Sequence, residues 1–366
     1  MILSVEPSAL TSYARQLDRA REDVSTIKAY IAKNAEGGTG GELISIAREG
    51  HTHAVEVIDG TFYRLACLLE TSSPELDKAA DYYQRTDLVA AARVDGTLPP
   101  GRGQCPTPLE YELASNVCKP GLFADPRFPE SHLKPPPEPE NPSNPLGWMD
   151  YLSLSSWAAK GCDIIFGFDP IGEMQEKLFG DWEALASMQA VLTNSGSALH
   201  DLAANIQSGA TTLQSTWRGN AGDTAYRYFT DLATAVDALK DPLNKIGEAY
   251  RVMAESVWAA GEAVGGALKG LIDSAVVAGI AAAAGTITAE TGVGAVVGYG
   301  IAGVEVANML RLWGEATKFA QNATAAVLLF RSVLTGTLSD LEMVKLPVIG
   351  GGAGYDHPLA GAGQHG

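Results

Sequence analysis

The chain has 366 residues, which corresponds to two or three domains of ordinary size. Its 43 acidic residues outnumber 26 basic ones and give a formal net charge of −17, which argues against nucleic acid and anionic membrane surfaces as partners. Six histidines and four cysteines are too few for a multi-metal enzyme or a disulfide scaffold.

The first residues do not resemble a general secretory signal. Met1 to Pro7 include no basic region, no apolar core and no small-residue cleavage site. We therefore expect a protein that is made in the cytoplasm and either stays there or leaves without a cleavable signal peptide.

The first predicted element is an antiparallel helical hairpin within residues 1–92. Apolar residues in 8–34 alternate at spacings of three and four, the pattern of a helix packed on another helix. The glycines of 37–41 end this helix, and a second apolar seam covers residues 55–83. Pro74 lies inside the second seam, where we expect it to kink or locally break the helix.

Residues 93–147 predict a semi-rigid, extended connector. Thirteen of the nineteen prolines lie between Pro99 and Pro145. Cys105 and Cys118 flank a 12-residue stretch of this connector. A disulfide between them would contribute up to about 3 kcal/mol, and both a disulfide and two free thiols remain open.

The second predicted hairpin lies within residues 148–270. A leucine-rich heptad pattern covers residues 185–213 and ends at a turn of small residues after Trp217. A further seam then runs from Phe229 to Val264 in steps of three and four. Pro242 interrupts the backbone ladder of that helix without interrupting the pattern.

Residues 271–340 form a Gly/Ala-rich helical segment, and 341–366 predict a flexible, glycine-rich tail. Within 274–304 the only charged residue is Glu290. Its longest uncharged run has 16 residues, fewer than the roughly 20 that span a bilayer. A packed soluble hairpin and a segment that inserts conditionally into a membrane therefore both remain open.

No segment shows a sustained alternation of apolar and polar residues, the pattern of a β-strand, so the predicted fold class is all-α. We expect two long antiparallel hairpins that resemble a four-helix bundle, followed by the small-residue hairpin.

Two short motifs lie at structurally informative places. Trp217 and Gly219 form a Trp-x-Gly at the turn of the second hairpin, where glycine permits a tight corner and the indole can be buried. Tyr83 and Asp87 lie at the end of the first hairpin, and their spacing would place them on one helical face. The alternatives are a purely structural tryptophan and a solvated helix end.

Helical hairpins with motifs at these places resemble the WXG family of type VII (ESX) secretion substrates. Residues 165–270 are similar to the WXG-type domain at the front of larger secreted actinobacterial effectors, including the channel-forming toxin CpnT. The likeness depends on Gly180-Asp181-Trp182-Glu183 and Trp217-Arg218-Gly219-Asn220-Ala221. Residues 1–90 resemble the EspC-like secretion-associated proteins, which open with a short Val-x-Pro-type start and end in Tyr-x-x-x-Asp.

The two hairpins depart from the family pattern in complementary ways. The first has no Trp-x-Gly at its turn, and the second has no Tyr-x-x-x-Asp after it, because Ala254 follows Tyr250 at that spacing. In the family, these two motifs come from two partners and form one composite signal. The resemblance therefore implies either a fused heterodimer, with the hairpins paired inside one chain, or a separate small WXG-type partner for each hairpin.

The favoured function is a non-enzymatic substrate or secretion-associated factor of a type VII system, recognised by its secretion ATPase or a chaperone. It would be secreted or displayed at the cell surface. The alternatives are a membrane-active, pore-forming effector that uses 274–304 and a cytoplasmic helical adaptor. We expect no enzyme, cofactor or metal site, because no motif gathers a nucleophile, base and oxyanion site. His51 and His53, the one histidine pair, would diverge on a helix.

Overall fold

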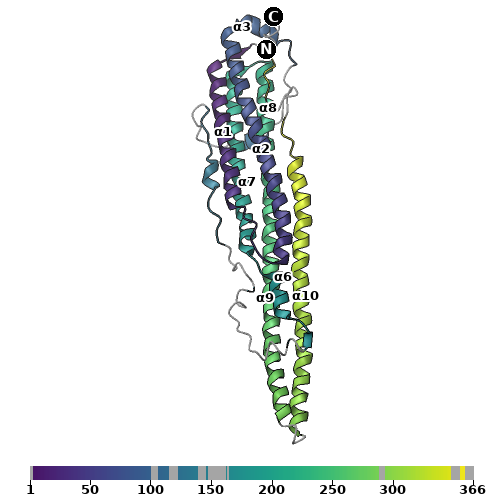
Figure 1. The fold of residues 1–366 in the computed structure, drawn as a ribbon. Helices are drawn as coiled ribbons and strands as arrows, with labels where there is room; N and C mark the ends of the chain where they lie inside the picture. Colours follow the sequence, from purple (N-terminus) through teal and green to yellow (C-terminus); the bar gives the residue numbers. More distant parts are fainter. Residues whose placement is uncertain are drawn as a thin grey trace.

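A computed structural model describes residues 3–99, 106–114, 123–138, 146, 162, 165–287, 293–347 and 355–358. The molecule is an elongated bundle of long helices (Figure 1), and the all-α prediction is confirmed. Among the described residues, strand structure consists of β1 (Ser4–Val5) and β2 (Trp217–Arg218), which form one short antiparallel pair, and of a bridge between Gly40 and Gly180.

The first hairpin consists of α1 (Pro7–Asn34) and α2 (Glu42–Arg85). Helix α1 begins at Pro7, whose fixed φ and missing N–H suit the first helical position. Helix α2 continues without a break through Pro74, so the expected local break does not occur. Short helices follow in the order α3 (Leu88–Asp95), α4 (Pro108–Ala114) and the 3-10 helix η1 (Pro129–His132).

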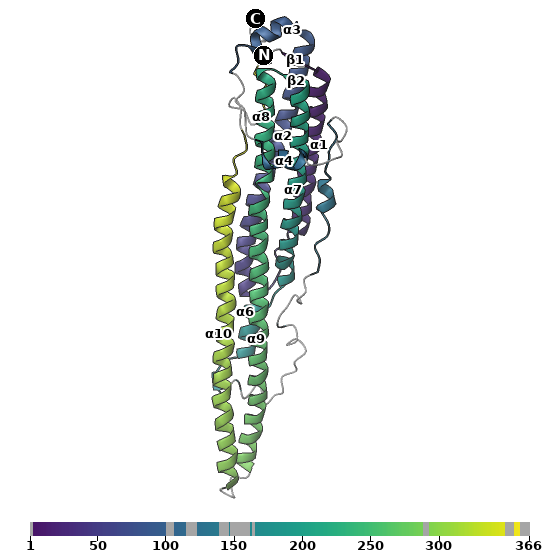
Figure 2. The same ribbon diagram turned by 180° about the vertical axis from the view of Figure 1, so that it is seen from behind.

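The second hairpin consists of α7 (Trp182–Thr216), which follows α6 (Pro170–Leu178), and of α8 (Asn220–Asp237) and α9 (Lys240–Ile287). The helix ends at Asp237 and restarts at Lys240, with Pro242 in the new first turn, so the interruption expected from this proline is present. Helix α9 passes through residue 270 without interruption. It packs along α10 (Val293–Met343), and this pair extends beyond the rest of the bundle (Figure 2).

The two hairpins share one hydrophobic core. Tyr13 of α1 donates a hydrogen bond from Oη to the carbonyl of Ile206 in α7, at 3.0 Å. The helices approach closely at Gly209, where a Cβ would lie 2.3 Å from the Tyr13 ring and 2.2 Å from Gln16 Oε1. Helices α1 and α7 therefore pair inside one chain, as the fused-heterodimer hypothesis required.

The described part of the connector lies against α7 rather than extending freely. The backbone N–H of Arg127 donates to Asn205 Oδ1 at 2.9 Å, and the guanidinium of Arg127 pairs with Glu112 and Asp201. His132 Nε2 lies 2.9 Å from the carboxylate of Asp201. These polar contacts hold α4 and η1 against the second hairpin.

Candidate functional site

The Trp-x-Gly motif lies at the end of the bundle where the two hairpins meet the N-terminal strand. Trp217 is fully buried and belongs to β2. Its strand pairs with β1, with Val5 opposite Trp217 and Ser4 opposite Arg218. The N–H of Glu6 extends this contact by donating to the carbonyl of Thr216 at 3.0 Å. The first residues of the chain therefore hold the turn of the second hairpin.

Gly219 is required at this turn by two separate geometric demands. Its φ of +137° is a conformation that residues with a side chain rarely adopt. A Cβ at this position would also lie 2.9 Å from Asp95 Oδ2 and 2.9 Å from Leu3 Cδ1. The glycine of the motif thus allows α3 and the N-terminal segment to approach the start of α8.

Tyr83 contacts Trp217 across the two hairpins. Their ring centroids are 5.8 Å apart and the rings are nearly perpendicular at 73°, the edge-to-face arrangement that aromatic pairs favour. Tyr83 is only 4% exposed. Burial raises the pKa of its hydroxyl well above the ordinary value, and the Trp217 side chain opposes this shift. The structure therefore brings the tyrosine of one predicted motif and the tryptophan of the other together.

Asp87 does not share a helical face with Tyr83, which corrects the prediction from their spacing. Helix α2 ends at Arg85, and Asp87 begins the next helix instead. Its Oδ1 accepts hydrogen bonds from the N–H groups of Val89 at 2.9 Å and Ala90 at 3.2 Å. Asp87 is therefore the exposed N-cap of α3. An Asp followed by an apolar run was the sequence signal for this cap.

Asp95, at the far end of α3, is a site residue that the sequence reasoning missed. Its carboxylate is buried and accepts hydrogen bonds from the N–H groups of Asn220, at 3.0 Å, and Ala221, at 2.9 Å. Gly219 is the N-cap position of α8 and has no side chain to cap it. Asp95 supplies that cap from a distant helix, so the segment after Tyr83 is fastened to the Trp-x-Gly turn.

The tail segment, which we define as residues 355–358, covers the same place. Tyr355 and His357 are each 1% exposed, although the glycine content predicted a flexible tail. The imidazole of His357 stacks on the Trp217 indole with centroids 5.5 Å apart and an interplanar angle of 26°. It also lies 5.6 Å from the Tyr83 ring. Burial lowers the pKa of His357 to about 4, and the negative charge of Asp95 partly opposes this shift.

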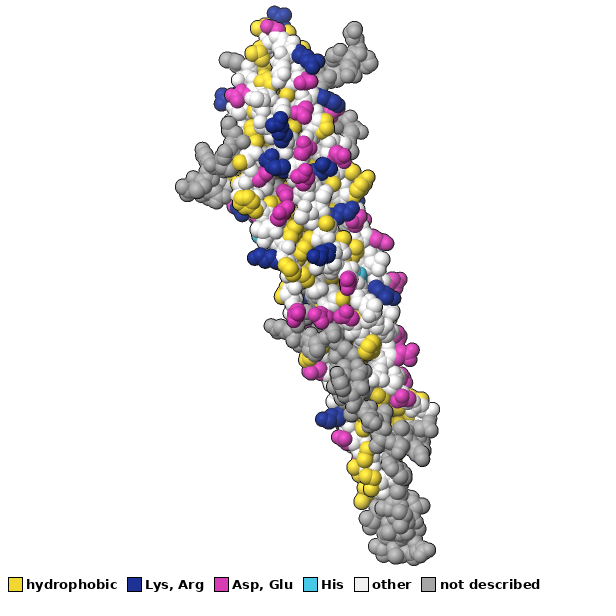
Figure 3. Space-filling model, turned by 60° about the vertical axis from the view of Figure 1, so that its left-hand side comes forward, with side chains coloured by type: hydrophobic (Ala, Val, Ile, Leu, Met, Phe, Trp, Pro, Cys, Tyr) yellow, Lys and Arg dark blue, Asp and Glu magenta, His cyan; other side chains and the backbone are white. Residues whose placement is uncertain are grey.

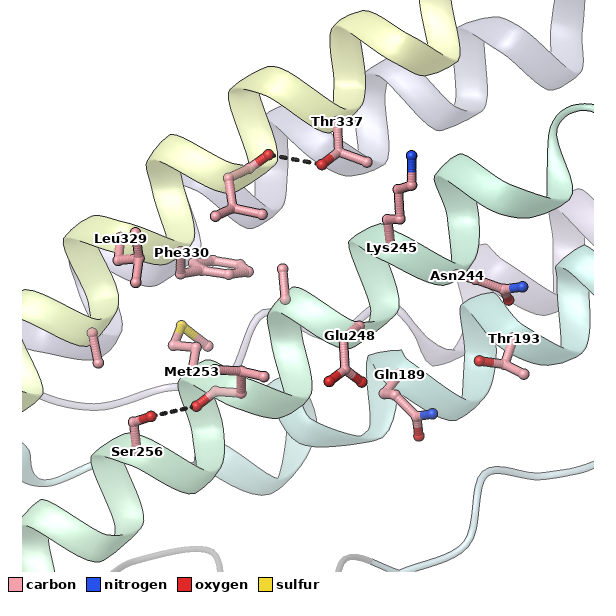
Figure 4. Close-up of a pocket in the computed structure, with 14 residues that line it drawn as sticks. Gln189, Thr193, Asn244, Lys245, Glu248, Met253, Ser256, Leu329, Phe330 and Thr337 are labelled. Carbon is pink, nitrogen blue, oxygen red and sulfur yellow. Dashed lines mark hydrogen bonds between the residues drawn. The ribbon is translucent and has the colours of Figure 1, made fainter.

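A groove of about 670 Å³ lies between α7, α9 and α10 (Figure 4). Its lining is mostly apolar and includes Met253, Leu329 and Phe330. The Ser256 hydroxyl donates to the carbonyl of Val252, and Glu248 pairs with Arg251. Within the described residues, no three His, Cys, Asp or Glu side chains are grouped so that they could hold a metal ion.

The extended α9–α10 pair presents apolar side chains to solvent. Val277 and Ile280 of α9 are 44% and 59% exposed, and Val304 of α10 is 69% exposed. Charged side chains of both signs are interspersed with hydrophobic ones over the broad part of the molecule, and hydrophobic side chains also lie at the described surface toward the narrow end (Figure 3). Two described helical stretches, 220–281 and 300–343, are long and apolar enough to cross a membrane, a criterion that core helices of soluble proteins also meet.

The remaining predicted residues do not add to this site. Cys105 and Cys118 lie outside the described residues, and Cys67 and Cys162 are free thiols. His51 is buried, with Nδ1 2.8 Å from Tyr250 Oη and Nε2 3.1 Å from the carbonyl of Ala35. Burial lowers the pKa of His51. A neutral His51 thus joins α2 to α9.

Comparison with known proteins places the Trp-x-Gly hairpin in a known context. Residues 180–261 match the WXG100 family, described as proteins of 100 residues with WXG. No curated protein and no solved structure matches the chain. The match covers α7, α8 and the first part of α9, and it supports a WXG-type helical domain related to type VII secretion at these residues. That family consists of secreted, non-enzymatic proteins that form helical hairpin partnerships.

Proposed function

We propose that this chain is a non-enzymatic substrate or secretion-associated factor of a type VII secretion system. Its export would depend on a composite signal in which Tyr83 and Asp87 belong to the first hairpin and Trp217 and Gly219 to the second. The contact between the Tyr83 and Trp217 rings carries this proposal, because it joins the two halves inside one chain. The WXG100 match to residues 180–261 supplies the link to type VII secretion.

In this proposal the first hairpin, residues 1–92, takes the place of the small partner of a WXG-type protein. The close approach of α1 to α7 at Gly209 supports this role, and Asp95, which follows the first hairpin in the chain, adds a cap on α8. The recognising partner would be the secretion ATPase or a chaperone. The protein would be made in the cytoplasm and delivered outside the cell or to its surface, where it acts through helical interfaces.

Export of single variants from the native host tests this proposal, with wild-type protein measured in culture filtrate and cell wall. Asp87→Asn removes the charge but retains an N-cap for α3, whereas Asp87→Ala removes both. Tyr83→Phe retains the buried ring, and Tyr83→Leu removes it. Signal recognition predicts that Asp87→Asn is retained in the cell with unchanged helicity. Normal export of Asp87→Asn together with loss for Asp87→Ala would assign Asp87 a structural role only.

Matched controls separate misfolding from failed recognition. Tyr63→Leu changes an exposed ring of α2 that lies outside this contact, and it should leave export unchanged. Circular dichroism and urea unfolding of each purified variant measure its fold. If the wild-type protein itself never leaves the cell, the export proposal fails and a cytoplasmic helical adaptor becomes the better account.

The second candidate is a membrane-active effector, which the exposed apolar residues of the α9–α10 pair favour. Dye leakage from liposomes at neutral and acidic pH tests it. Membrane activity predicts leakage that falls in an Ile280→Ser, Val304→Ser double variant but not in a Leu329→Ser control on the broad part of the bundle. Absence of leakage from the wild-type protein at either pH would remove this candidate.

A further inference from the structure

The tail segment lies in a slot lined by side chains from both hairpins. We define this aromatic slot by the residues that line it: Ser72, Tyr82, Tyr83, Trp217, Tyr228 and Phe229. Helix α2 supplies the first three of these residues, β2 supplies Trp217, and α8 supplies the last two. The slot therefore exists only when the two hairpins are paired.

Each half of the slot holds one side chain of the tail. The Tyr355 ring lies 5.5 Å from Tyr228 and 5.3 Å from Phe229, and the N–H of Tyr355 donates to Ser72 Oγ at 3.0 Å. His357, two residues later, stacks on Trp217. Asp356 lies between them and points to solvent. Alternate side chains of the tail enter the slot. Proteins that bind extended peptides use pockets for alternate side chains in the same way.

The balance of forces makes this occupant displaceable. Burial of the Tyr355 and His357 rings favours docking. Against it, Tyr355 Oη is enclosed without a hydrogen-bond partner among the described residues. Each enclosed polar group of this kind opposes burial. A short tether to α10, which ends at Met343, offsets the weak binding by holding the tail at a high local concentration.

We infer that the aromatic slot is a binding site for an extended peptide of the form Tyr-x-His, occupied within the chain by its own residues 355–357. The tail then covers Tyr83 and Trp217, so a partner that reads these two rings must first displace it. This second statement rests on the proposed export function, whereas the peptide site itself does not.

Hydroxyl-radical footprinting of the full-length protein measures the solvent access of each aromatic side chain. In a Tyr355→Ser, His357→Ser double variant, oxidation of Trp217 and Tyr83 should rise several-fold. Trp182 provides the internal reference, because it is buried at the other end of α7 and its indole donates to the carbonyl of Leu178. The matched control is Asp356→Asn, which changes the exposed residue of the tail and should leave the oxidation rates unchanged.

A free peptide then tests the slot directly. A fluorescein-labelled peptide with the sequence of residues 352–360 should bind the double variant, as measured by anisotropy, and restore protection of Trp217. The same peptide with serine in place of Tyr355 and His357 should do neither. Wild-type protein should bind the peptide more weakly, because its own tail competes.

Two results would overturn the inference: unchanged oxidation of Trp217 and Tyr83 in the double variant, or no difference between the two peptides. A rise in Trp182 oxidation would indicate that the double variant is misfolded. The Tyr355→Ser and His357→Ser single variants then replace it, and the same oxidation rates of Trp217 and Tyr83 are measured. Both assays use purified protein, so loss of export in cells would leave the peptide site standing, and failure of the peptide assay would leave the export proposal standing.

Discussion

Tyr83 of the first hairpin and Trp217 of the second meet edge to face, with ring centroids 5.8 Å apart, at the end of the bundle that also holds β1 and α3. Their contact depends on elements from several parts of the chain. Strand β1 pairs with the strand that contains Trp217, and Asp95 caps the helix that follows it. The four stability and docking predictions below concern the contacts that hold this arrangement together.

Replacing Gly219 with alanine should destabilise the turn. The left-handed φ of +137° and the 2.9 Å approach of Asp95 both oppose a Cβ. We expect the free energy of unfolding to fall by about 1–3 kcal/mol in urea titrations. The control is Gly60→Ala in the interior of α2, where no atom lies within 4 Å of the new methyl group. That variant should gain up to about 1 kcal/mol; equal effects at the two glycines would contradict the account.

Removal of the Asp95 carboxylate should loosen the start of α8. Asp95→Ala leaves the N–H groups of Asn220 and Ala221 without their acceptor and should lower the free energy of unfolding by about 1–2 kcal/mol. Asp95→Asn retains one acceptor oxygen and should lie between alanine and wild type. Hydrogen exchange of the 219–223 amides should accelerate in the same order. Unchanged exchange there would show that the cap does not hold this turn.

Substitution of Gly209 tests whether the two hairpins pack tightly against each other. A methyl group there would meet the Tyr13 ring and Gln16 Oε1, so Gly209→Ala must push α1 away from α7. Overpacking of this kind costs about 1–3 kcal/mol. Gly314→Ala in α10, where the added methyl group meets open space, is the control. A crystal structure or chemical cross-links of Gly209→Ala that show an unchanged α1–α7 spacing would contradict the tight packing.

Docking of the tail segment should weaken in acid because of His357. Its pKa is about 4 when docked and about 6.5 when free, so the free tail binds a proton between these values that the docked tail does not. Docking is therefore unaffected above pH 6.5 and loses up to about 3 kcal/mol as the pH falls to 4. Asp95 on α3, Tyr82 and Tyr83 on α2, and Asp356 are the titratable groups near this imidazole.

The measurement is Trp217 oxidation as a function of pH. It should rise below pH 6 in the wild-type protein and stay nearly constant in His357→Phe, which keeps a ring on the indole but cannot take up a proton. Identical pH profiles for the two proteins would exclude His357 as the cause.

The long helices could be predicted because their buried faces repeat every three or four residues. The pattern placed α1 within a residue of its true start, and Pro242, rather than the pattern, indicated the interruption of the helix near residue 240. The start of α2 at Glu42 was not visible, because the apolar seam becomes regular only near Val55. The path of α2 through Pro74 was missed for another reason: packing of the long helix against its neighbours outweighs a local breaker.

Only some residues of the candidate site could be predicted from the sequence. Trp217 and Tyr83 were singled out by their places at a turn and a helix end, and the structure brings them together. The roles of Asp95 and His357 depend on contacts between residues far apart in the chain, for which spacing gives no signal. Asp87 was placed on the wrong element because α2 ends at Arg85, two residues before Asp87.

The most direct test of the central claim compares export of Tyr83→Leu, Trp217→Phe and the double variant from a host with an active type VII system. A single composite signal predicts that each single variant loses export and that the double variant is no worse than the poorer of the two. Export losses that multiply in the double variant, with all three proteins folded, would show two independent signals and contradict a signal assembled by contact between the hairpins.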